Sequence, residues 1–348
     1  MVYNEIKTFL EQAMNNKLFG TIDGKDVYLY TLKSECATAE IMTRGATLVR
    51  LTTYGVDIVG GFATLERYLE DTSHQGATIG RIANRVANAS FTMDGAIYML
   101  PDNDHGNCLH GGVGFDARIW SVKDASDSSI TLTYYSEDGE EGFPSGLNTE
   151  VTYTLTDATL LIDYKAIPEG KTPIALTNHS YFNLDGFGDT IYDHKAKIHA
   201  NCYTEVDDKL IPTGKHIALE GTPYDFRAPR TLGECIDDDF GGYDVNFVIS
   251  PSEYAEFIGK KLALAAEVEN GTLRMSVYTD QPGIQLYTAN FLKKCSSSNL
   301  FHGDIDPIKH GAFCLETQTE PNCVNHGIGF YDAGEVYTHT TVYKIEKK

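Results

Sequence analysis

The segment from Val151 to Tyr164 reads VTYTLTDATLLIDY, and its two apolar runs flank a central Asp-Ala dipeptide. β-Branched and aromatic residues on both sides of a short polar turn are typical of a β-hairpin. The segment FTMDGAIYML, from Phe91 to Leu100, has the same form around Asp-Gly, a strong signal of a two-residue hairpin turn. Both segments predict antiparallel strands joined by tight turns.

Strand signals continue along the whole chain. The 21 Tyr, 16 Phe and 32 Gly, against a single Trp, favour strands joined by turns. Helical signals are few: residues 3–14 and Thr64–Leu69 are predicted to be helical, and Tyr254–Leu264 fits either a helix or a strand. Further strands are predicted at Val27–Leu32, Ile130–Tyr135, Lys197–Ala200, Arg274–Thr279, Ile284–Thr288, Ala312–Thr317 and Val336–Ile345.

The domain organisation follows from the spacing of these strands. No Pro- or Ser-rich linker, fixed-period repeat or low-complexity segment divides the chain. Closely spaced strands from end to end predict an all-β protein built as one large β-sandwich with few short helices. We expect a single domain over residues 1–348, in which residues 1–17 form an N-terminal helical extension.

Composition and charge exclude several classes of protein. Lys and Arg number 28 against 49 Asp and Glu, so the formal net charge is −21, and an acidic surface repels the phosphate backbone of nucleic acids. No apolar run approaches the roughly 18 residues that span a bilayer, and Glu5, Lys7 and Glu11 interrupt the apolar stretch that a signal peptide needs. Seven cysteines form no CxxC pair, which argues against a disulfide framework and a structural zinc site. We therefore expect a cytoplasmic protein without a nucleic-acid or membrane partner.

Four segments carry polar residues that a plain strand or turn does not need. In the first, GRIANRV at 80–86, small residues surround Asn84 and Arg85. Arg85 offers a rigid fork of donors for hydroxyl or carboxylate oxygens, and a structural ion pair is the alternative. In the second, HGG at 110–112, two glycines let a ligand approach the ring of His110; a half-buried structural histidine is the alternative.

The other two segments contain the residues best suited to proton transfer. In TNHSYFN at 177–183, hydrogen-bonding groups surround His179, and histidine exchanges protons near neutral pH. FCLETQ at 313–318 is predicted to be a strand in which Cys314, Glu316 and Gln318 share one face. Apolar neighbours would raise the pKa of Glu316 and make it a stronger base. The alternatives are a turn closed by polar side chains and a glutamate that points to solvent from an edge strand.

Two glycine-bordered stretches add further hydrogen-bonding groups. Asp244 lies in GGYDVNF at 241–247, and Gln285 in QPGIQLY at 281–287. Asp, Asn, Gln and Arg can bind sugar hydroxyl groups through directional or bidentate hydrogen bonds. The alternative is that these polar residues only stabilise turns. The motifs GxGxxG, GxxxxGK[ST], HExxH and GxSxG are absent. His302, Asp304, Asp306 and His310 have the spacing of a solvated loop rather than of a metal site.

Taken together and in this order, these segments resemble the aldose 1-epimerase family, also called galactose mutarotases, from about Leu18 to Tyr343. The resemblance includes GRIANR at 80–85, LHGG at 109–112, GFD at 114–116 and DGEEGFP at 138–144. It also includes TNHSYFNL at 177–184, GYD at 242–244, QPGIQ at 281–285 and FCLETQ at 313–318. It implies a β-supersandwich fold with a shallow sugar cleft, and interconversion of the α and β anomers of an aldohexose such as D-galactose or D-glucose.

The resemblance also implies roles for individual residues. Glu316 corresponds to the catalytic base, His179 to the catalytic acid and His110 to a second active-site histidine; the residues corresponding to substrate binders are Asn84, Arg85, Asp244 and Gln285. Ala175 stands where the family usually has Asn, Val245 where His often follows the Asp, and Ser145 where Gly usually follows the Pro. None of these departures replaces a proton-transfer residue.

The implied reaction needs neither a metal nor a cofactor. The base takes the proton of the C1 hydroxyl and the acid protonates the ring oxygen, so the ring opens to the aldehyde and closes again on the opposite face. On this basis we expect a bell-shaped pH profile with its acid limb set by Glu316 and its alkaline limb by His179. The rivals are a sugar-phosphate epimerase, which would need more basic residues, a glycosidase, which would need two carboxylates, and a non-catalytic sugar-binding protein. The sequence leaves open the choice between galactose and glucose and between a monomer and a homodimer.

Overall fold

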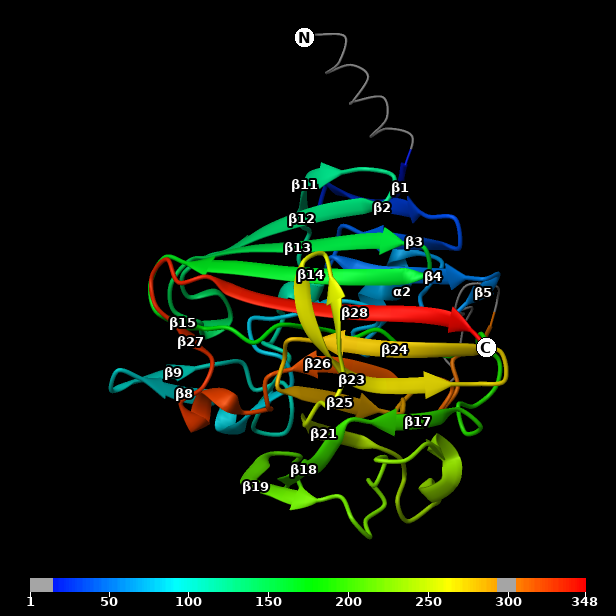
Figure 1. Cartoon of the computed structure of the whole chain (residues 1–348). Coiled ribbons are helices and arrows are strands. Elements are labelled where there is room, and N and C mark those ends of the chain that lie inside the picture. Colours follow the sequence, from blue (N-terminus) through cyan, green and yellow to red (C-terminus); the bar gives the residue numbers. More distant parts are fainter. Residues whose placement is uncertain (1–14, 293–304) are drawn as a thin grey trace, which may run out of the picture.

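The computed structural model describes residues 15–292 and 305–348. The helix predicted at residues 3–14 lies outside this range. Within it, strands account for most of the regular structure (Figure 1). The helices are α2 (Leu65–Glu70) and the short 3₁₀ turns η1 (Ala87–Ala89), η2 (Phe115–Ala117), η3 (Glu140–Gly142), η4 (Leu232–Cys235) and η5 (Cys323–His326). No helix in the described part of the chain has the length and hydropathy of a membrane span.

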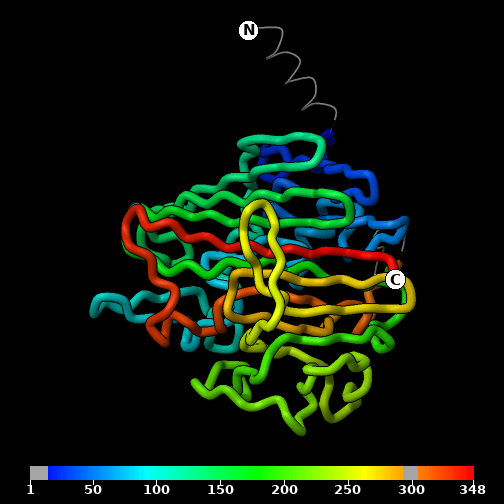
Figure 2. Tube along the Cα trace, in the orientation of Figure 1, coloured from blue at the N-terminus to red at the C-terminus, as the bar shows by residue number. Residues whose placement is uncertain are grey.

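The largest layer is a ten-stranded antiparallel sheet. Its strands are β11 (Ser121–Ala125), β12 (Ser129–Ser136), β13 (Leu147–Thr156), β14 (Thr159–Pro168), β17 (Lys195–Ile198), β20 (Arg230–Thr231), β22 (Tyr254–Phe257), β23 (Lys260–Glu269), β24 (Leu273–Thr279) and β28 (Tyr337–Lys347). Nine of them lie side by side in the order β11-β12-β13-β14-β28-β24-β23-β17-β20. The tenth, β22, forms a hairpin with β23 and is not part of this row. The C-terminal strand β28 therefore lies between β14 and β24, as the red tube between green and yellow shows in Figure 2.

Two further sheets have five strands each. The first contains β1 (Asn16–Ile22), β2 (Lys25–Lys33), β3 (Ala37–Met42), β4 (Thr47–Thr53) and β5 (Val56–Asp57), in sequence order. The second contains β18 (Ala200–Val206), β19 (Pro212–Ala218), β21 (Asp244–Ile249), β25 (Gly283–Tyr287) and β26 (Cys314–Gln318). Its order is β19-β18-β21-β25-β26, so β26 is its last strand.

Four two-stranded pairs connect the loops between these sheets. They are β6 (Thr78–Ile79) with β16 (Thr177–Asn178), β7 (Arg85–Val86) with β10 (Cys108–Leu109), β8 (Ser90–Met93) with β9 (Ala96–Met99), and β15 (Thr172–Pro173) with β27 (Phe330–Tyr331). The pairs β6–β16 and β7–β10 hold together chain segments that contain predicted site residues.

One apolar core joins the three large sheets. Leu48 of β4, Ile162 of β14, Leu286 of β25 and Leu315 of β26 belong to a single cluster of buried side chains. The period-two pattern explains this, because alternate residues of each strand point to the same face. Burial of each such side chain stabilises the fold by about 1.5–3 kcal/mol. The predicted all-β sandwich is therefore confirmed.

The hairpins that the sequence predicted are also present. Asp157, at the turn between β13 and β14, has a φ of 50°, and Asp94 and Gly95, between β8 and β9, have φ values of 52° and 82°. These left-handed conformations match the twist of paired strands, which is why Asp and Gly occupy such turns. The ambiguous segment 254–264 forms the hairpin β22–β23, and the predicted short helix is α2.

Two boundaries differ from the sequence-based prediction. Residues 197–200 do not form one strand, because the chain leaves the ten-stranded sheet after β17 and enters the second five-stranded sheet as β18. Alternation continues across this junction, so the pattern of side chains alone does not reveal the change of sheet. Asn16 and Lys17, assigned to the N-terminal extension, belong to β1 and pair with Tyr30 and Leu29.

Candidate active site

A cleft of about 710 Å³, open to solvent on one side, collects most of the predicted site residues. The cleft is lined by β21, β25 and β26 of the second five-stranded sheet and by the loops that follow α2, β10 and β16. The predicted residues among its lining are Asn84, Arg85, His110, His179, Asp244 and Glu316.

Glu316 projects from the middle of β26. Although β26 is the last strand of its sheet, the Glu316 side chain is only 2% exposed, which contradicts the solvent-pointing alternative. The alternation of the strand places Leu315 and Thr317 on the opposite face, where Leu315 enters the core and the Thr317 hydroxyl bonds His339. The predicted division of FCLETQ into two faces is thus confirmed.

His179 follows β16 and faces Glu316 across the cleft. Its Nε2 lies 3.7 Å from Oε1 of Glu316, and its side chain is 8% exposed. The ring stacks on Tyr181 at a centroid distance of 5.1 Å, and the Cys314 sulfur lies 3.6 Å from Nδ1. With Nδ1 in contact with the protein, Nε2 is the nitrogen that faces the carboxylate and any bound molecule.

Burial acts on the two ionisable groups in opposite directions. It raises the pKa of Glu316 well above its usual value, and the negative charge of Asp244 raises it further. It also lowers the pKa of His179 to about 3. Both shifts arise because a desolvated group favours its neutral form. Oε2 of Glu316 is buried without a hydrogen-bond partner in the described structure, so it is available to a bound hydroxyl group.

His110 is held in a single tautomer. Its Nδ1 accepts the backbone N–H of Asn84 at 3.2 Å, and its own backbone N–H donates to the Asn84 carbonyl at 3.0 Å. Burial lowers the pKa of His110 well below its usual value, and the positive charge of Arg85 acts in the same direction. A neutral imidazole whose Nδ1 accepts carries its proton on Nε2. His110 is therefore suited to donate a hydrogen bond rather than to exchange a proton.

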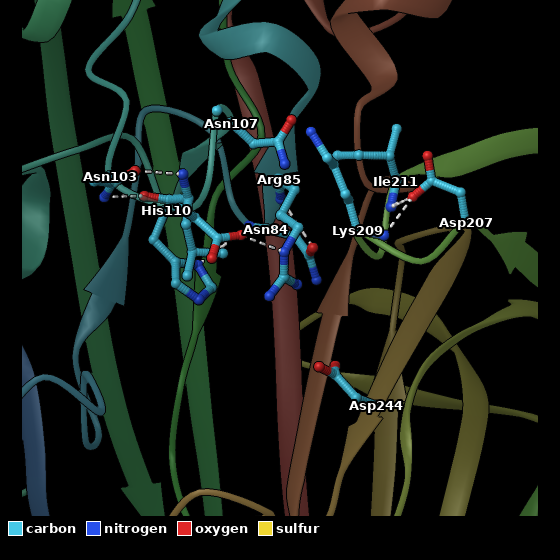
Figure 3. Close-up of polar contacts among 12 residues, drawn as sticks. Asn84, Arg85, Asn103, Asn107, His110, Asp207, Lys209, Ile211 and Asp244 are labelled. Carbon is cyan, nitrogen blue, oxygen red and sulfur yellow. Dashed lines mark hydrogen bonds and ion pairs between the residues drawn. The ribbon is translucent and has the colours of Figure 1, made fainter.

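Arg85 begins β7 beside His110, and its guanidinium is fixed by an ion pair. Nε donates to Asp104 at 2.7 Å, and the backbone N–H of Arg85 donates to the Asn84 side chain at 2.8 Å. Figure 3 shows Asn84, Arg85 and His110 close together above Asp244. The structural ion pair and the binding role are compatible. The bond to Asp104 uses only Nε, so the two terminal nitrogens of the guanidinium can donate to a ligand.

The other arginine of the same motif has a different task. Arg81 is 1% exposed and donates to the backbone and hydroxyl groups of Ser136, Thr172 and Pro144. It thus ties the loop before β7 to the large sheet and lies outside the cleft lining.

Gln285 lies one layer behind the cleft surface. It pairs across the sheet with Glu316 on one side and Asn246 on the other, and its Nε2 donates to Asp244 at 2.6 Å. It lines a small adjoining pocket together with Asn84, Arg85 and Asp244, but not the main cleft. The structure therefore brings Gln285 to the site as the group that orients Asp244.

Sequence reasoning missed several residues of the cleft. Tyr181 and Tyr287 supply aromatic surface, and their rings lie 6.1 Å apart in an edge-to-face arrangement. Tyr181 follows His179 by two residues in the same segment, which is a signal that could have found it. His74 also lines the cleft, with Nδ1 2.9 Å from Asp116. His74 belongs to no motif, so nothing local indicated it.

No group of three or more His, Cys, Asp or Glu side chains is placed to hold a metal ion in residues 15–292 and 305–348. Two members of the loop considered in the sequence for such a site, His302 and Asp304, fall outside the described residues. His310 instead contacts the carbonyl oxygen of Thr288 through Nδ1 at 2.8 Å.

Comparison with known proteins identifies the family of the chain. The sequence profile of aldose 1-epimerases matches residues 28–344. The chain belongs to the aldose 1-epimerase family. It is similar to the galactose mutarotase of Homo sapiens, with 39% identity over 96% of this chain and 98% of the relative. It is also similar to the aldose 1-epimerase of Escherichia coli K12, with 34% identity over 93% of this chain and 96% of the relative.

The fold of the family is shared as well. The crystal structure of a GalM/aldose epimerase homologue from C. elegans covers 92% of this chain and 98% of its own, with a TM-score of 0.82 and 28% identity. This aldose 1-epimerase fold places the three departures noted in the sequence away from the cleft lining. Ala175 and Val245 are buried in apolar clusters. Ser145 has a φ of 69°, a conformation that glycine adopts at lower cost.

Proposed function

We propose that the protein interconverts the α and β anomers of aldohexoses, such as D-galactose and D-glucose, by general acid–base ring opening and closure. The observation that carries this proposal is the Glu316–His179 pair, whose polar atoms face each other at 3.7 Å in a cleft lined by further hydrogen-bonding and aromatic side chains. Membership of the aldose 1-epimerase family supports the reaction class.

In the proposed reaction, Glu316 accepts the proton of the C1 hydroxyl while Nε2 of His179 donates a proton to the ring oxygen. The bond between C1 and the ring oxygen breaks, and C1 becomes the aldehyde carbon. Rotation about the C1–C2 bond presents the other face of the carbonyl, and the two proton transfers then run in reverse. Both groups return to their initial protonation states, so the cycle consumes nothing. Acid–base catalysis by one positioned group accelerates a reaction by about 10²–10⁴-fold.

The remaining residues hold the sugar in a reactive position. Neutral His110 donates through Nε2, and Arg85 and Asn84 offer guanidinium and amide donors next to it. Asp244, oriented by Gln285, accepts from sugar hydroxyl groups. Tyr181 and Tyr287 supply the apolar surface against which a sugar ring packs.

The rival functions lack comparable support. Among the described lining residues Arg85 is the single cation, and Asp104 already neutralises it, so a phosphate group would find little charge to bind. The group nearest to Glu316 on the opposite wall is a histidine rather than a second carboxylate. We further propose a single-domain cytoplasmic monomer or homodimer that acts on a free monosaccharide. The free thiols of the described cysteines support a reducing compartment, and the net charge of −21 disfavours a nucleic-acid partner.

Polarimetry of freshly dissolved α-D-galactose and α-D-glucose tests the proposed function. The purified protein should speed the decay of optical rotation, with no added nucleotide, and should keep this activity in EDTA. A nitrophenyl galactoside in the same buffer should remain intact, because a glycosidase would release nitrophenol. The absence of acceleration with both sugars would overturn the proposal.

The pH dependence should follow the direction in which burial shifts the two groups. Between the two pKa values the pair holds one proton, and in the free protein this proton resides mainly on Glu316. The reactive form of the pair, in which His179 carries the proton and Glu316 is ionised, also holds one proton and is therefore populated over the same pH range. The rate therefore falls at low pH when His179 takes up a second proton, and at high pH when Glu316 loses its own. This reverses the assignment of limbs expected from the sequence.

The nitrogen-15 chemical shifts of the His179 ring, recorded against pH, distinguish these assignments. We expect a neutral imidazole at pH 6, since its pKa is about 3. A cationic His179 ring at neutral pH would restore the assignment made from the sequence.

Replacement of Arg85 by Ala is expected to reduce kcat/KM by about 10- to 100-fold, because the sugar loses a positioning group. The melting temperature should change little, since Arg85 makes one ion pair at the cleft surface. Arg85→Lys should recover only part of the activity, because it keeps the charge and loses the planar fork.

The matched variant Arg81→Ala should behave in the opposite way and lower the melting temperature strongly, because it removes a buried set of hydrogen bonds. A loss of stability in Arg85→Ala as large as that in Arg81→Ala would show that Arg85 is structural.

A further inference from the structure

His74 is a cleft residue that the proposed reaction does not use. It lies in the loop after α2 and lines the cleft, and its side chain is 21% exposed. Its φ is 55°, a conformation that costs free energy for a residue other than glycine. The loop is nevertheless held in place by two backbone hydrogen bonds. The Ala77 N–H donates to the His74 carbonyl at 3.1 Å, and the Gly76 N–H donates to the His179 carbonyl at 2.9 Å.

Asp116 fixes the orientation of the His74 ring. Nδ1 of His74 lies 2.9 Å from Oδ2 of Asp116, which itself belongs to η2 on the other side of the loop. A carboxylate accepts only, so Nδ1 carries the proton and donates it. The two nitrogens of an imidazole point away from each other, and Nε2 is therefore directed away from Asp116. In the described structure no residue is hydrogen-bonded to this Nε2, while Asp116 is not part of the cleft lining.

The ring stands beside the two active-site histidines. Its centroid lies 4.8 Å from that of His110, in an edge-to-face arrangement, and 6.2 Å from that of His179. Arg44 and Asp71 line a small pocket behind it together with Asp116. Three imidazoles thus form one wall of the cleft. In two of them, His110 and His74, a hydrogen bond between Nδ1 and the protein fixes which nitrogen carries the proton.

We propose that His74, oriented by Asp116, binds one hydroxyl group of the bound aldohexose through Nε2 and is a specificity-determining residue of this cleft. The proposal rests on the function proposed above, because it takes the bound molecule to be an aldohexose. The ring is anchored on the protein side, reaches the cleft and has an unpaired hydrogen-bonding atom, which are the properties of a residue that selects among hydroxyl positions.

A set of monodeoxy sugars tests this contact. In His74→Phe, which keeps a flat ring without the nitrogen atoms, KM for D-galactose should rise about tenfold while kcat changes less than about threefold. The 2-, 3-, 4- and 6-deoxy analogues are then compared in the wild type and the variant. For one analogue the two proteins should have equal KM values, since the hydroxyl that His74 binds is already missing. Asp116→Asn should weaken binding of D-galactose in the same direction and spare the same analogue.

His216→Phe is the matched control, because His216 also pairs with a carboxylate, Glu320 at 3.2 Å, but lies outside the cleft lining. It should leave every KM unchanged. An equal loss for all analogues in His74→Phe, or no loss at all, would overturn the proposal. A wild type without any mutarotase activity would instead overturn the proposed function; sugar binding measured by calorimetry would then still report whether His74→Phe loses affinity.

Discussion

Glu316→Gln should lower kcat for α-D-galactose by about 10²–10⁴-fold, because the amide keeps the shape of the side chain but cannot accept the C1 hydroxyl proton. KM should change by less than about threefold, since the amide still forms hydrogen bonds to the sugar. The side chain is buried, and the replacement removes a desolvated acid, so the melting temperature should not fall. Polarimetry at saturating sugar measures kcat directly.

Glu320→Gln provides the matched control. Glu320 lies shortly after β26 and contacts His216, outside the cleft lining, so its replacement should leave kcat unchanged. A Glu316→Gln protein with nearly full kcat would refute the assignment of the base and the acid–base mechanism that depends on it.

His179→Asn should reduce kcat to a similar extent, again by about 10²–10⁴-fold, because asparagine can occupy the place of Nδ1 or Nε2 but cannot transfer a proton. The two protons move in linked steps, so the double variant Glu316→Gln/His179→Asn should be little slower than the slower single variant. Independent contributions would instead multiply, and multiplied losses would contradict the action of the two residues as a unit.

The pair His199–Glu267 is the matched control for His179–Glu316. His199 is also buried, with Nε2 3.4 Å from Glu267, but neither residue lines the cleft. His199→Asn should leave kcat unchanged, whatever it does to stability. Equal losses in the two histidine variants would mean that loss of packing, rather than loss of the acid, explains the effect.

Local patterns in the sequence predicted much of the fold. The apolar runs of VTYTLTDATLLIDY on both sides of its short turn placed β13 and β14, because β-branched and aromatic residues favour strands. The alternation of side chains along a strand put Glu316 of FCLETQ on the face opposite to Leu315 and Thr317. Turn residues such as Asp94 and Gly95 were equally informative, since the left-handed conformation they need is a local property. The junction between β17 and β18 was not predictable, because a change of sheet leaves the local pattern intact.

The sequence alone determined which residue types the site contains, through short segments whose order and spacing resemble one family. Only the tertiary structure decided how these residues are arranged. It separated Arg81 from Arg85, placed Gln285 behind Asp244, and added His74, which no motif marks. It also set the direction in which burial shifts both groups, raising the pKa of Glu316 and lowering that of His179, since desolvation depends on everything that surrounds a group. Distance and burial arise from the packing of segments far apart in the chain, and for this reason no local pattern contains them.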